Sequence, residues 1–179
     1  MSENSKEQVC RCPDHWPDWD GAELSLSGRC VHRMSIPSFF HMPLAFDMYV
    51  GKQAENIEQL DLKPVWPGLV FSRTGMWGGE LICLIEDAES PSRLVQYLPP
   101  PFDVHFMLHH GGIGTIQKTL REQQMRLTDA GKVPGDLYMG HLTCPVCEER
   151  KGGEKILMMR RWKSSKRLQG KISNRASTV

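Results

Sequence analysis

The stretch DVHFMLHHGGIGTIQKTLREQQMRLTDAGKVPGDLY, residues 103–138, decides the fold. Residues 104–110 alternate with the period of a β-strand, which places the apolar Val104, Phe106 and Leu108 on one face. After a short glycine-rich connection, residues 115–130 have helical periodicity, and Gly131 follows where a left-handed residue commonly ends a helix. The apolar stripe of this helix consists of Ile116, Leu120 and Leu127. We therefore predict a strand, a helix and then a return into further strands.

A similar pattern occurs earlier in the chain, so the sequence contains two copies of one unit. Pro134-Gly135 matches Pro67-Gly68, and each pair precedes an apolar run, a turn and a second apolar run. The second copy ends in a hairpin predicted over residues 137–162. The first copy is predicted as a strand over 44–50, a helix over 54–60 and a hairpin over 69–86. The expected fold class is α+β, with two repeated strand-helix-strand-strand modules forming an antiparallel sheet and a cleft between them.

A length of 179 residues accommodates one such duplicated domain. Residues 1–41 are predicted as an N-terminal arm rich in Cys and Pro, 42–163 as the ligand-binding domain, and 164–179 as a basic, disordered tail. The chain is 40% hydrophobic, and counting Gly instead of Tyr gives about 47%, which is typical of globular proteins. Residues 1–9 lack an apolar export signal and no apolar run approaches the roughly 20 residues of a membrane span. We expect a cytoplasmic protein without membrane contact.

Charge is distributed unevenly along the chain. Its 22 Lys and Arg and 21 Asp and Glu give a net charge of +1. Residues 150–179 contain ten basic residues and one acidic residue, so the remaining 149 residues carry a net charge of −8. An acidic body favours a cationic or neutral ligand over an anionic one. The basic segment, which includes Trp162, can contact nucleic acid or an acidic partner, although no known nucleic-acid-binding module surrounds it.

Six cysteines in a chain without an export signal are expected to be reduced, and four of them fall in two close pairs. Cys144-Pro-Val-Cys147 has the spacing of a zinc knuckle and lies where the second hairpin must turn. Cys10-Arg-Cys12 has a shorter spacing and can supply the other two ligands if the arm packs against that hairpin. We predict that Cys10, Cys12, Cys144 and Cys147 bind a structural zinc ion that clamps the arm.

Other interpretations of these residues stay open. His15, Cys30 and His32 lie near the first pair in sequence and can form a local ligand set, and His141 lies three residues before Cys144. A Cys-x-x-Cys pair is also compatible with two buried thiols or with a redox-active dithiol, neither of which holds a metal.

The second copy resembles a known family. The resemblance rests on Leu98-Pro99 before a strand, His109-His110-Gly111 before a helix, Gly131 at its end, Pro134-Gly135, and Tyr138 on the next strand. Over about residues 42–162 the chain is similar to the GyrI-like (gyrase-inhibitor-like) small-molecule-binding domains. The resemblance implies two pseudo-symmetric modules and a ligand cleft lined by aromatic residues and often an acidic one.

That acidic position corresponds to Asp136, where the family more often has Glu. The shorter carboxylate would sit further from a ligand, which puts a cation-binding role in doubt. Family members are often fused to helix-turn-helix domains, but residues 1–36 lack paired helical periods. Stand-alone members include binders, gyrase modulators and a hydrolase subgroup.

Candidate ligand-binding residues come from both copies. The strand over 103–110 places His105 and His109 on one face, where they can line the cleft as acid-base groups or metal ligands, or be hydrogen-bonded residues of a sheet face. Glu80 either reaches into a pocket beside Trp77 or is solvated at a strand end. Aromatic walls attract cations and flat ligands, although core packing is their commoner role. The candidates are Tyr49, Trp66, Trp77, Glu80, His105, His109, Asp136 and Tyr138.

These patterns favour a small-molecule-binding protein that senses or sequesters an organic ligand, either cationic or aromatic, and that has a structural zinc site. One alternative is a hydrolase of the cleft, with His105 or His109 and Glu80 or Asp136 as proton-transfer groups. The other is an interaction protein that contacts nucleic acid or an acidic partner through its basic tail. Residues 111–114 lack the spacing of a phosphate loop, and no Gly-x-Ser-x-Gly or His-Glu-x-x-His motif occurs.

Overall fold

The structure is a computed structural model that describes residues 10–89 and 92–170. The strands are β1 (Glu23–Ser25), β2 (Cys30–Ile36), β3 (Ser38–Phe39), β4 (Met42–Pro43), β5 (Phe71–Thr74), β6 (Gly79–Leu84), β7 (Val95–Tyr97), β8 (Asp103–His110), β9 (Lys132–His141) and β10 (Lys155–Ser164). The helices are α1 (Phe46–Gln59), the 3-10 turn η1 (Ile113–Thr115) and α2 (Gln117–Asp129). No helix in the described part of the chain has the length and apolar character needed to span a bilayer.

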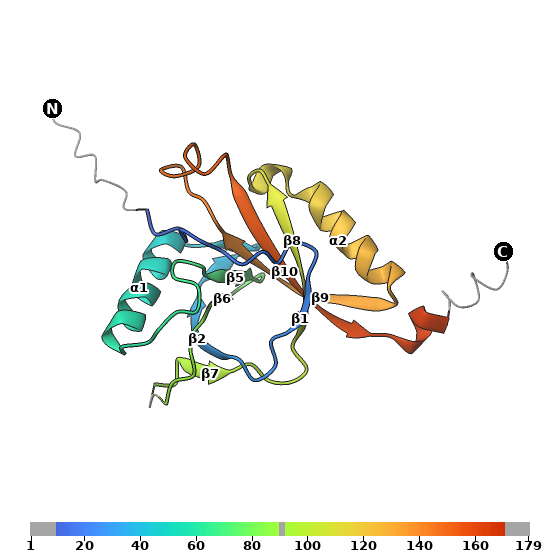
Figure 1. The fold of residues 1–179 in the computed structure, drawn as a ribbon, viewed down its shortest axis with the longest axis horizontal. Helices are drawn as coiled ribbons and strands as arrows, with labels where there is room; N and C mark the ends of the chain where they lie inside the picture. The colour runs from blue at the N-terminus through green and yellow to red at the C-terminus, as the bar shows by residue number, and fades with distance from the viewer. Residues whose placement is uncertain (1–9, 90–91, 171–179) are drawn as a thin grey trace.

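Eight strands form one antiparallel sheet in the order β1-β8-β10-β9-β5-β6-β2-β7, which curls around one face (Figure 1). The first module consists of β2, α1, β5 and β6, and the second of β8, α2, β9 and β10. Reading outward from the junction of β9 and β5, each module contributes its second, third and first strand in the same order. The predicted α+β class is therefore confirmed, and in both modules the elements follow the order strand, helix, strand, strand.

The beginning of the first module differs from the sequence prediction. Residues 44–50 are not a strand, because α1 begins at Phe46 and the module's first strand is β2, within the segment predicted as an arm. Phe46, Tyr49 and Val50 pack together against the sheet at the three- and four-residue spacing of a helix. The prediction failed because β2 is covered on both faces and lacks the alternation of a half-exposed strand. The arm also contributes β1, which pairs with β8.

The two faces of the sheet are covered differently. Both helices lie on the outer face, and the segment before β1 crosses the inner face (Figure 1). In β8, Val104 and Phe106 point to the inner face, while Met107 packs with Ile116 of the α2 side. The inner-face core also contains Leu26, Val31, Leu69, Phe71, Ile82, Leu84, Leu98, Phe102, Tyr138, Leu142, Leu157 and Met159.

A matching polar contact fastens each helix to the first strand of its own module. In the first module, the Gln53 side-chain amide donates to the His32 ring Nδ1 at 3.2 Å and to the His32 carbonyl at 3.1 Å. In the second module, Gln123 makes the same two contacts with His105, at 3.3 and 3.0 Å. All four residues are buried. The duplication therefore extends from strand order to individual buried side chains.

These contacts make stability depend on pH. Burial lowers the pKa of His32 and also of His105, so below the unfolded-state pKa of about 6.5 the unfolded chain binds more protons than the folded chain. The free energy of unfolding is therefore greatest above that pH and decreases as the pH falls below it. Urea unfolding should show a smaller decrease between pH 7.5 and pH 5.5 for the variant H32Q/H105Q than for the wild type.

The variant H110Q serves as the matched control, because His110 ends the same strand as His105 but is exposed. The pH dependence of its unfolding free energy should equal that of the wild type. Both proteins retain all six cysteines, so any cysteine contribution is the same in each. An unchanged pH dependence in H32Q/H105Q would contradict the prediction.

Candidate functional site

Four cysteines from the two ends of the chain meet at one point. The Sγ atoms of Cys10, Cys12, Cys144 and Cys147 all lie within 4.8 Å of one another. The Cys144 Sγ lies 3.8 Å from that of Cys10 and 3.9 Å from that of Cys147. Tetrahedral zinc with bonds of about 2.3 Å places its sulfur ligands about 3.8 Å apart. The two separations from Cys144 therefore match those of a tetrahedral zinc-type site.

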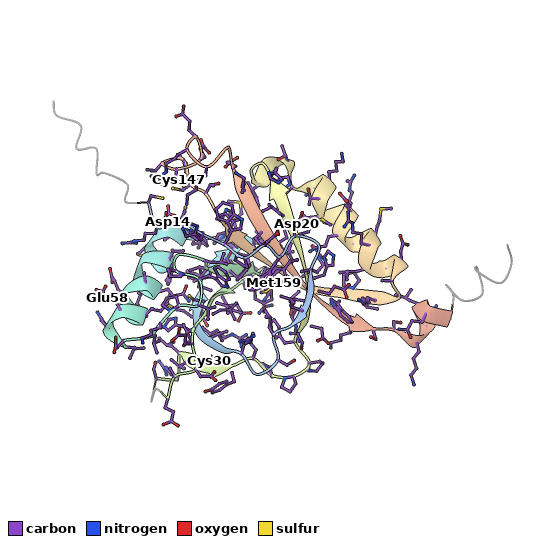
Figure 2. The ribbon with its side chains drawn as sticks, viewed as in Figure 1. Asp14, Asp20, Cys30, Glu58, Cys147 and Met159 are labelled. Carbon is purple, nitrogen blue, oxygen red and sulfur yellow. The ribbon has the colours of Figure 1, made fainter. Side chains whose placement is uncertain are left out.

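The loop between β9 and β10 forms the knuckle that holds two of these thiols. The Cys147 and Glu148 amides donate to the Cys144 carbonyl, each at 2.9 Å, and the Cys144 amide donates to the Cys147 Sγ at 3.3 Å. The Lys151 ammonium donates to the Pro13 carbonyl at 2.6 Å, which ties the loop directly to the arm. Figure 2 shows Cys147 at this loop, next to the arm.

The arm approaches the cluster over a glycine. Gly68 has φ of +80°, and a Cβ there would lie 2.8 Å from both the Arg11 carbonyl oxygen and the Pro13 nitrogen. Glycine is needed for the left-handed conformation and for this close approach. Pro67-Gly68 therefore marks the place where the arm crosses the first module.

The chemistry of the cluster indicates a closed structural site. A hydrogen bond from the Cys12 backbone lowers the pKa of Cys10, whereas burial raises the pKa of Cys12. A bound dication would favour the thiolate at all four positions, and four sulfur ligands would leave no coordination position for substrate. The alternative ligands Cys30 and His32 lie in the core instead, and burial raises the pKa of Cys83, which packs beside Cys30, to about 12.

Beyond the cysteines, the arm covers one end of the inner face with tryptophan. Trp19 packs on Phe106 with ring centroids 4.6 Å apart and on Trp66 at 6.2 Å. Gly21 and Ala22 then form backbone hydrogen bonds with Phe106. Trp66, which the sequence suggested as a pocket wall, is thus part of the contact between arm and core.

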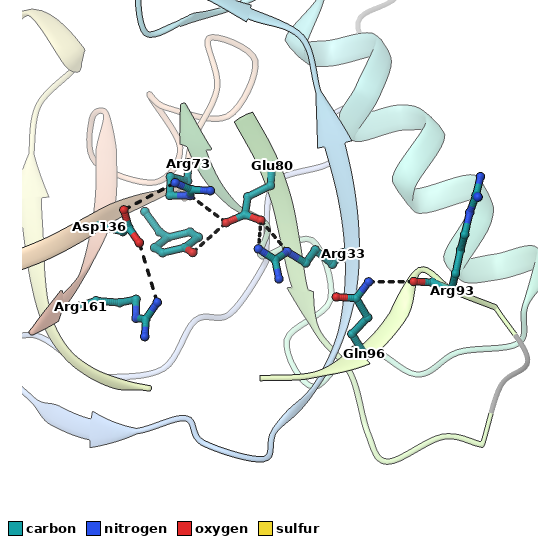
Figure 3. A network of polar contacts seen from close by, with 8 residues as sticks. Arg33, Arg73, Glu80, Arg93, Gln96, Asp136 and Arg161 are labelled. Carbon is teal, nitrogen blue, oxygen red and sulfur yellow. Dashed lines mark hydrogen bonds and ion pairs between the residues drawn. The ribbon is translucent and has the colours of Figure 1, made fainter. Parts of the chain in front are cut away.

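The other end of the inner face carries a charged network that joins the two modules (Figure 3). Glu80 is only 5% exposed. Its carboxylate accepts hydrogen bonds from Arg33 Nε at 2.5 Å, Arg73 Nε at 2.8 Å and the Tyr138 hydroxyl at 2.8 Å. The residues Arg33, Arg73, Glu80, Asp136, Tyr138 and Arg161 are called the inner-face arginine site below.

Asp136 and Arg161 extend this site. Asp136 lies 3.5 Å from Arg73 and 3.8 Å from Arg161. Arg161 stacks over Phe102, 4.3 Å from the ring centroid, and donates to the Pro101 carbonyl at 2.9 Å. Three guanidinium groups thus surround two carboxylates.

Electrostatics fix the protonation of the buried carboxylate. Burial by itself would raise the pKa of Glu80, but the hydrogen bonds from Tyr138, Arg73 and Arg33 outweigh it and lower that pKa. Burial and the neighbouring Glu80 raise the pKa of Tyr138. Glu80 is therefore an ion held by three donors, and Tyr138 is a neutral donor.

The predicted ligand-binding residues do not all meet. Glu80, Asp136 and Tyr138 belong to the inner-face arginine site, whereas His105 and His109 lie on the opposite face, beneath α2. His109 bonds Thr119 Oγ1 at 2.8 Å and Thr115 Oγ1 at 3.0 Å, so both ring nitrogens are occupied by residues of the α2 side. The expectation that this face lines the cleft is corrected: the second helix covers it.

Two aromatic candidates also lie elsewhere. Tyr49 of α1 packs against the outer face of the sheet. Trp77 is 73% exposed and forms a surface aromatic cluster with Phe39 and Phe40. Neither contacts the inner-face arginine site.

The basic C-terminal segment, residues 150–179, begins in the loop before β10 and continues through that strand. Arg161 belongs to β10, residues 166–170 continue as a helical turn, and Lys163, Lys166 and Arg167 are exposed. Disorder was predicted for residues 164–179, but Ser164 ends β10 and residues 166–170 are helical. Residues 171–179 lie outside the described part of the chain. Contact with nucleic acid or an acidic partner stays a prediction.

Two cavities that the sequence did not reveal lie between α1 and the arm. The larger has a volume of about 540 Å³ and borders Cys12 and Cys144, and the smaller has about 400 Å³. His141, Asp47 and Glu154 line the larger one. One sequence feature could have indicated the larger cavity: His141 lies at the end of a strand, three residues before Cys144 of the knuckle.

Comparisons with known proteins support the fold and a family. A model of the family described as bacterial hydrolase matches residues 1–161. The crystal structure of the EcmrR C-terminal domain superposes with a TM-score of 0.58 at 9% identity, covering 80% of this chain and 97% of that chain. The cryo-EM structure of an EcmrR-DNA complex gives 0.54 at 9% identity, covering 80% and 56%. No curated protein matches the sequence. The structural likeness confirms a GyrI-like fold.

The cysteine cluster leads to a direct test. Protein purified without chelator should contain about one zinc ion per chain by elemental analysis, and C147S should lose most of it. Loss of the clamp should reduce the free energy of unfolding by about 3 kcal/mol, or lower Tm by about 10 °C, because the arm is then held by fewer contacts. C83A is the matched control, since Cys83 is buried outside the cluster. Stoichiometric zinc retained in C147S would contradict the four-cysteine site.

Proposed function

The chain belongs to the bacterial hydrolase family, and from its GyrI-like fold we propose that it binds a small organic anion at the inner-face arginine site. The observation that supports this most strongly is the convergence of Arg33, Arg73 and Arg161 around Glu80 and Asp136. Three positive charges against two negative charges leave the site with a net positive charge. A carboxylate-bearing ligand would restore neutrality.

The arginines have the exposure and the donors that such a ligand requires. The side chains of Arg33, Arg73 and Arg161 are 34%, 36% and 26% exposed. Each guanidinium has five N–H donors, and the contacts to Glu80, Asp136 and Pro101 use only part of them. Planar guanidinium groups bind carboxylates with paired hydrogen bonds. The buried Phe102 ring beneath Arg161 holds that guanidinium in place by a cation–π contact.

This ligand class differs from the cationic ligand that the sequence favoured. That expectation used the net charge of −8 of the chain outside residues 150–179. Arg161 comes from the basic part of the chain, and Arg33 and Arg73 come from two separate strands. Local charge at a site decides the ligand class more directly than the total charge of the body.

We propose zinc at the four cysteines as a structural clamp for the arm. Trp19 of the clamped arm covers the inner face around Phe106. The inner-face arginine site, with Glu80 and Tyr138, lies at the other end of that face. In this proposal the metal orders the arm and keeps that apolar core covered, so that ligand binds at the charged end. The zinc ion takes no part in binding.

A second candidate function is hydrolysis, which the family match favours. Among the groups of the inner-face arginine site, neither Glu80 nor Tyr138 suits proton transfer. The Glu80 carboxylate accepts three hydrogen bonds, which lower its pKa, and the pKa of Tyr138 is raised. Hydrolysis needs a group with a free basic atom, which neither Glu80 nor Tyr138 provides.

Anion binding can be measured by isothermal titration with 1-naphthoate. The variants R33Q and R161Q should each weaken its binding about tenfold or more, because each removes a charge-assisted hydrogen bond. D136N should strengthen binding by removing a negative charge. R93Q is the matched control, because Arg93 lies in a nearby loop outside the network (Figure 3).

The opposite charge class serves as the competing probe. Binding of tetraphenylphosphonium in place of 1-naphthoate would contradict the proposal, as would an equal loss of affinity in R93Q. Thermal unfolding of each variant separates lost affinity from lost folding.

A further inference from the structure

We propose that the larger cavity between α1 and the cysteine cluster is a hydrolytic site for small carboxylic esters, with His141 as the general base. This rests on hydrolysis as the second candidate function and gives it a place in the fold. The cavity, here called the α1 pocket, is formed by residues of α1, the arm, the end of β9 and the knuckle loop.

The α1 pocket has the size and lining of a small-molecule site. Its volume of about 540 Å³ falls within the usual range of about 300–1,000 Å³. Phe46, Val50 and Val70 make part of its wall apolar, which suits a short hydrocarbon chain. Its ionisable groups are Arg11, Asp47, His141, Glu154 and the thiols of the cluster, Cys12 and Cys144.

His141 is held in place by its neighbours. It is the last residue of β9 and pairs with Ile156 of β10. Its ring meets the Phe46 ring edge to face, with centroids 5.8 Å apart and an interplanar angle of 65°. The ring is half-buried on the wall of the α1 pocket, and within residues 10–89 and 92–170 no side chain forms a hydrogen bond with its nitrogens.

The charges around His141 suit a base. Burial lowers its pKa, while Glu154 and Asp47 act in the opposite direction. The imidazole is therefore neutral at pH 7 and able to accept a proton, and the two carboxylates then stabilise the imidazolium that forms. Asp47 and Glu154 are exposed at the rim and act through His141 as positioning residues.

The reaction balances without any further reagent. An imidazole nitrogen of His141 takes a proton from a water molecule as the water oxygen attacks the ester carbonyl carbon. The bond from that carbon to the alkoxy oxygen then breaks, and the departing oxygen takes the proton back from the imidazolium. The products are a carboxylic acid and an alcohol. The guanidinium of Arg11 is the cation on this wall and offsets the negative charge that develops on the carbonyl oxygen.

Each of the other buried histidines already has at least one ring nitrogen in a polar contact. The Nδ1 atoms of His32 and His105 contact glutamine amides, and both ring nitrogens of His109 contact threonine hydroxyls. None of these three lines either cavity beside α1. His141 is thus the buried or half-buried histidine whose surroundings leave room for a substrate.

The experiment uses the full-length, zinc-loaded protein and 4-nitrophenyl butyrate as the probe. H141Q should reduce kcat at least about 100-fold, the usual lower range for a general base. H110Q is the matched control for unspecific ester cleavage by an exposed histidine and should keep the wild-type rate. Circular dichroism, Tm and zinc content of H141Q show whether it is folded.

A second variant, D47N/E154Q, changes only the rim. Without the two carboxylates the pKa of His141 should fall, so the acidic limb of the pH profile of kcat/KM should move to lower pH, with kcat reduced about tenfold. A merely structural role for the carboxylates would leave that limb in place.

Absence of turnover by the wild type, equal kcat in H141Q and wild type, or an equal loss in H110Q would overturn the proposal. Hydrolysis that depends on Arg161 and not on His141 would also overturn it, by moving the reaction to the inner face. Failure of 1-naphthoate binding with His141-dependent hydrolysis intact would overturn the anion-binding proposal alone.

Discussion

The structure depends on one buried carboxylate at the seam between two modules. The β5–β9 ladder that joins the modules has only two register pairs, Phe71 with Gly140 and Ser72 with Met139. Glu80 of the first module adds the hydrogen bond from Tyr138 of the second. An unpaired buried charge destabilises a fold by several kcal/mol. The arginines and the tyrosine around Glu80 must therefore be present together, and this requirement fixes the relative position of the modules.

Packing at the same seam imposes a second requirement. A Cβ at residue 140 would lie 3.0 Å from Leu69 Cδ1 and 3.1 Å from Phe71 Cε1. The Phe71 ring occupies the space that a side chain at this position would need, and it reaches Phe106 with centroids 6.1 Å apart. One glycine thus lets the aromatic core run continuously from one module into the other.

The sequence predicted the second module well and the first module less well. In residues 103–138, strand and helix periods are clear and a glycine marks each boundary. β2 was missed because both of its faces are covered. The cysteine cluster was predicted because residue type and spacing are enough to indicate thiol ligands. The sequence predicted Glu80, Asp136 and Tyr138 as ligand-binding residues. It did not predict the three arginines that meet them or the α1 pocket, because these residues come from separate segments and meet only through tertiary packing.

The cysteine cluster also has a consequence for the order in which the protein matures during synthesis. Cys10 is synthesised well before Cys144, which lies 134 residues later in the chain. The first module therefore emerges before the arm can contact the second cysteine pair. The entropy of closing such a loop grows only with the logarithm of its length, so the long separation adds little cost. Under the proposed zinc clamp, metal capture would follow synthesis of the second hairpin, and a chain truncated before that hairpin would expose its tryptophans to chaperones and proteases.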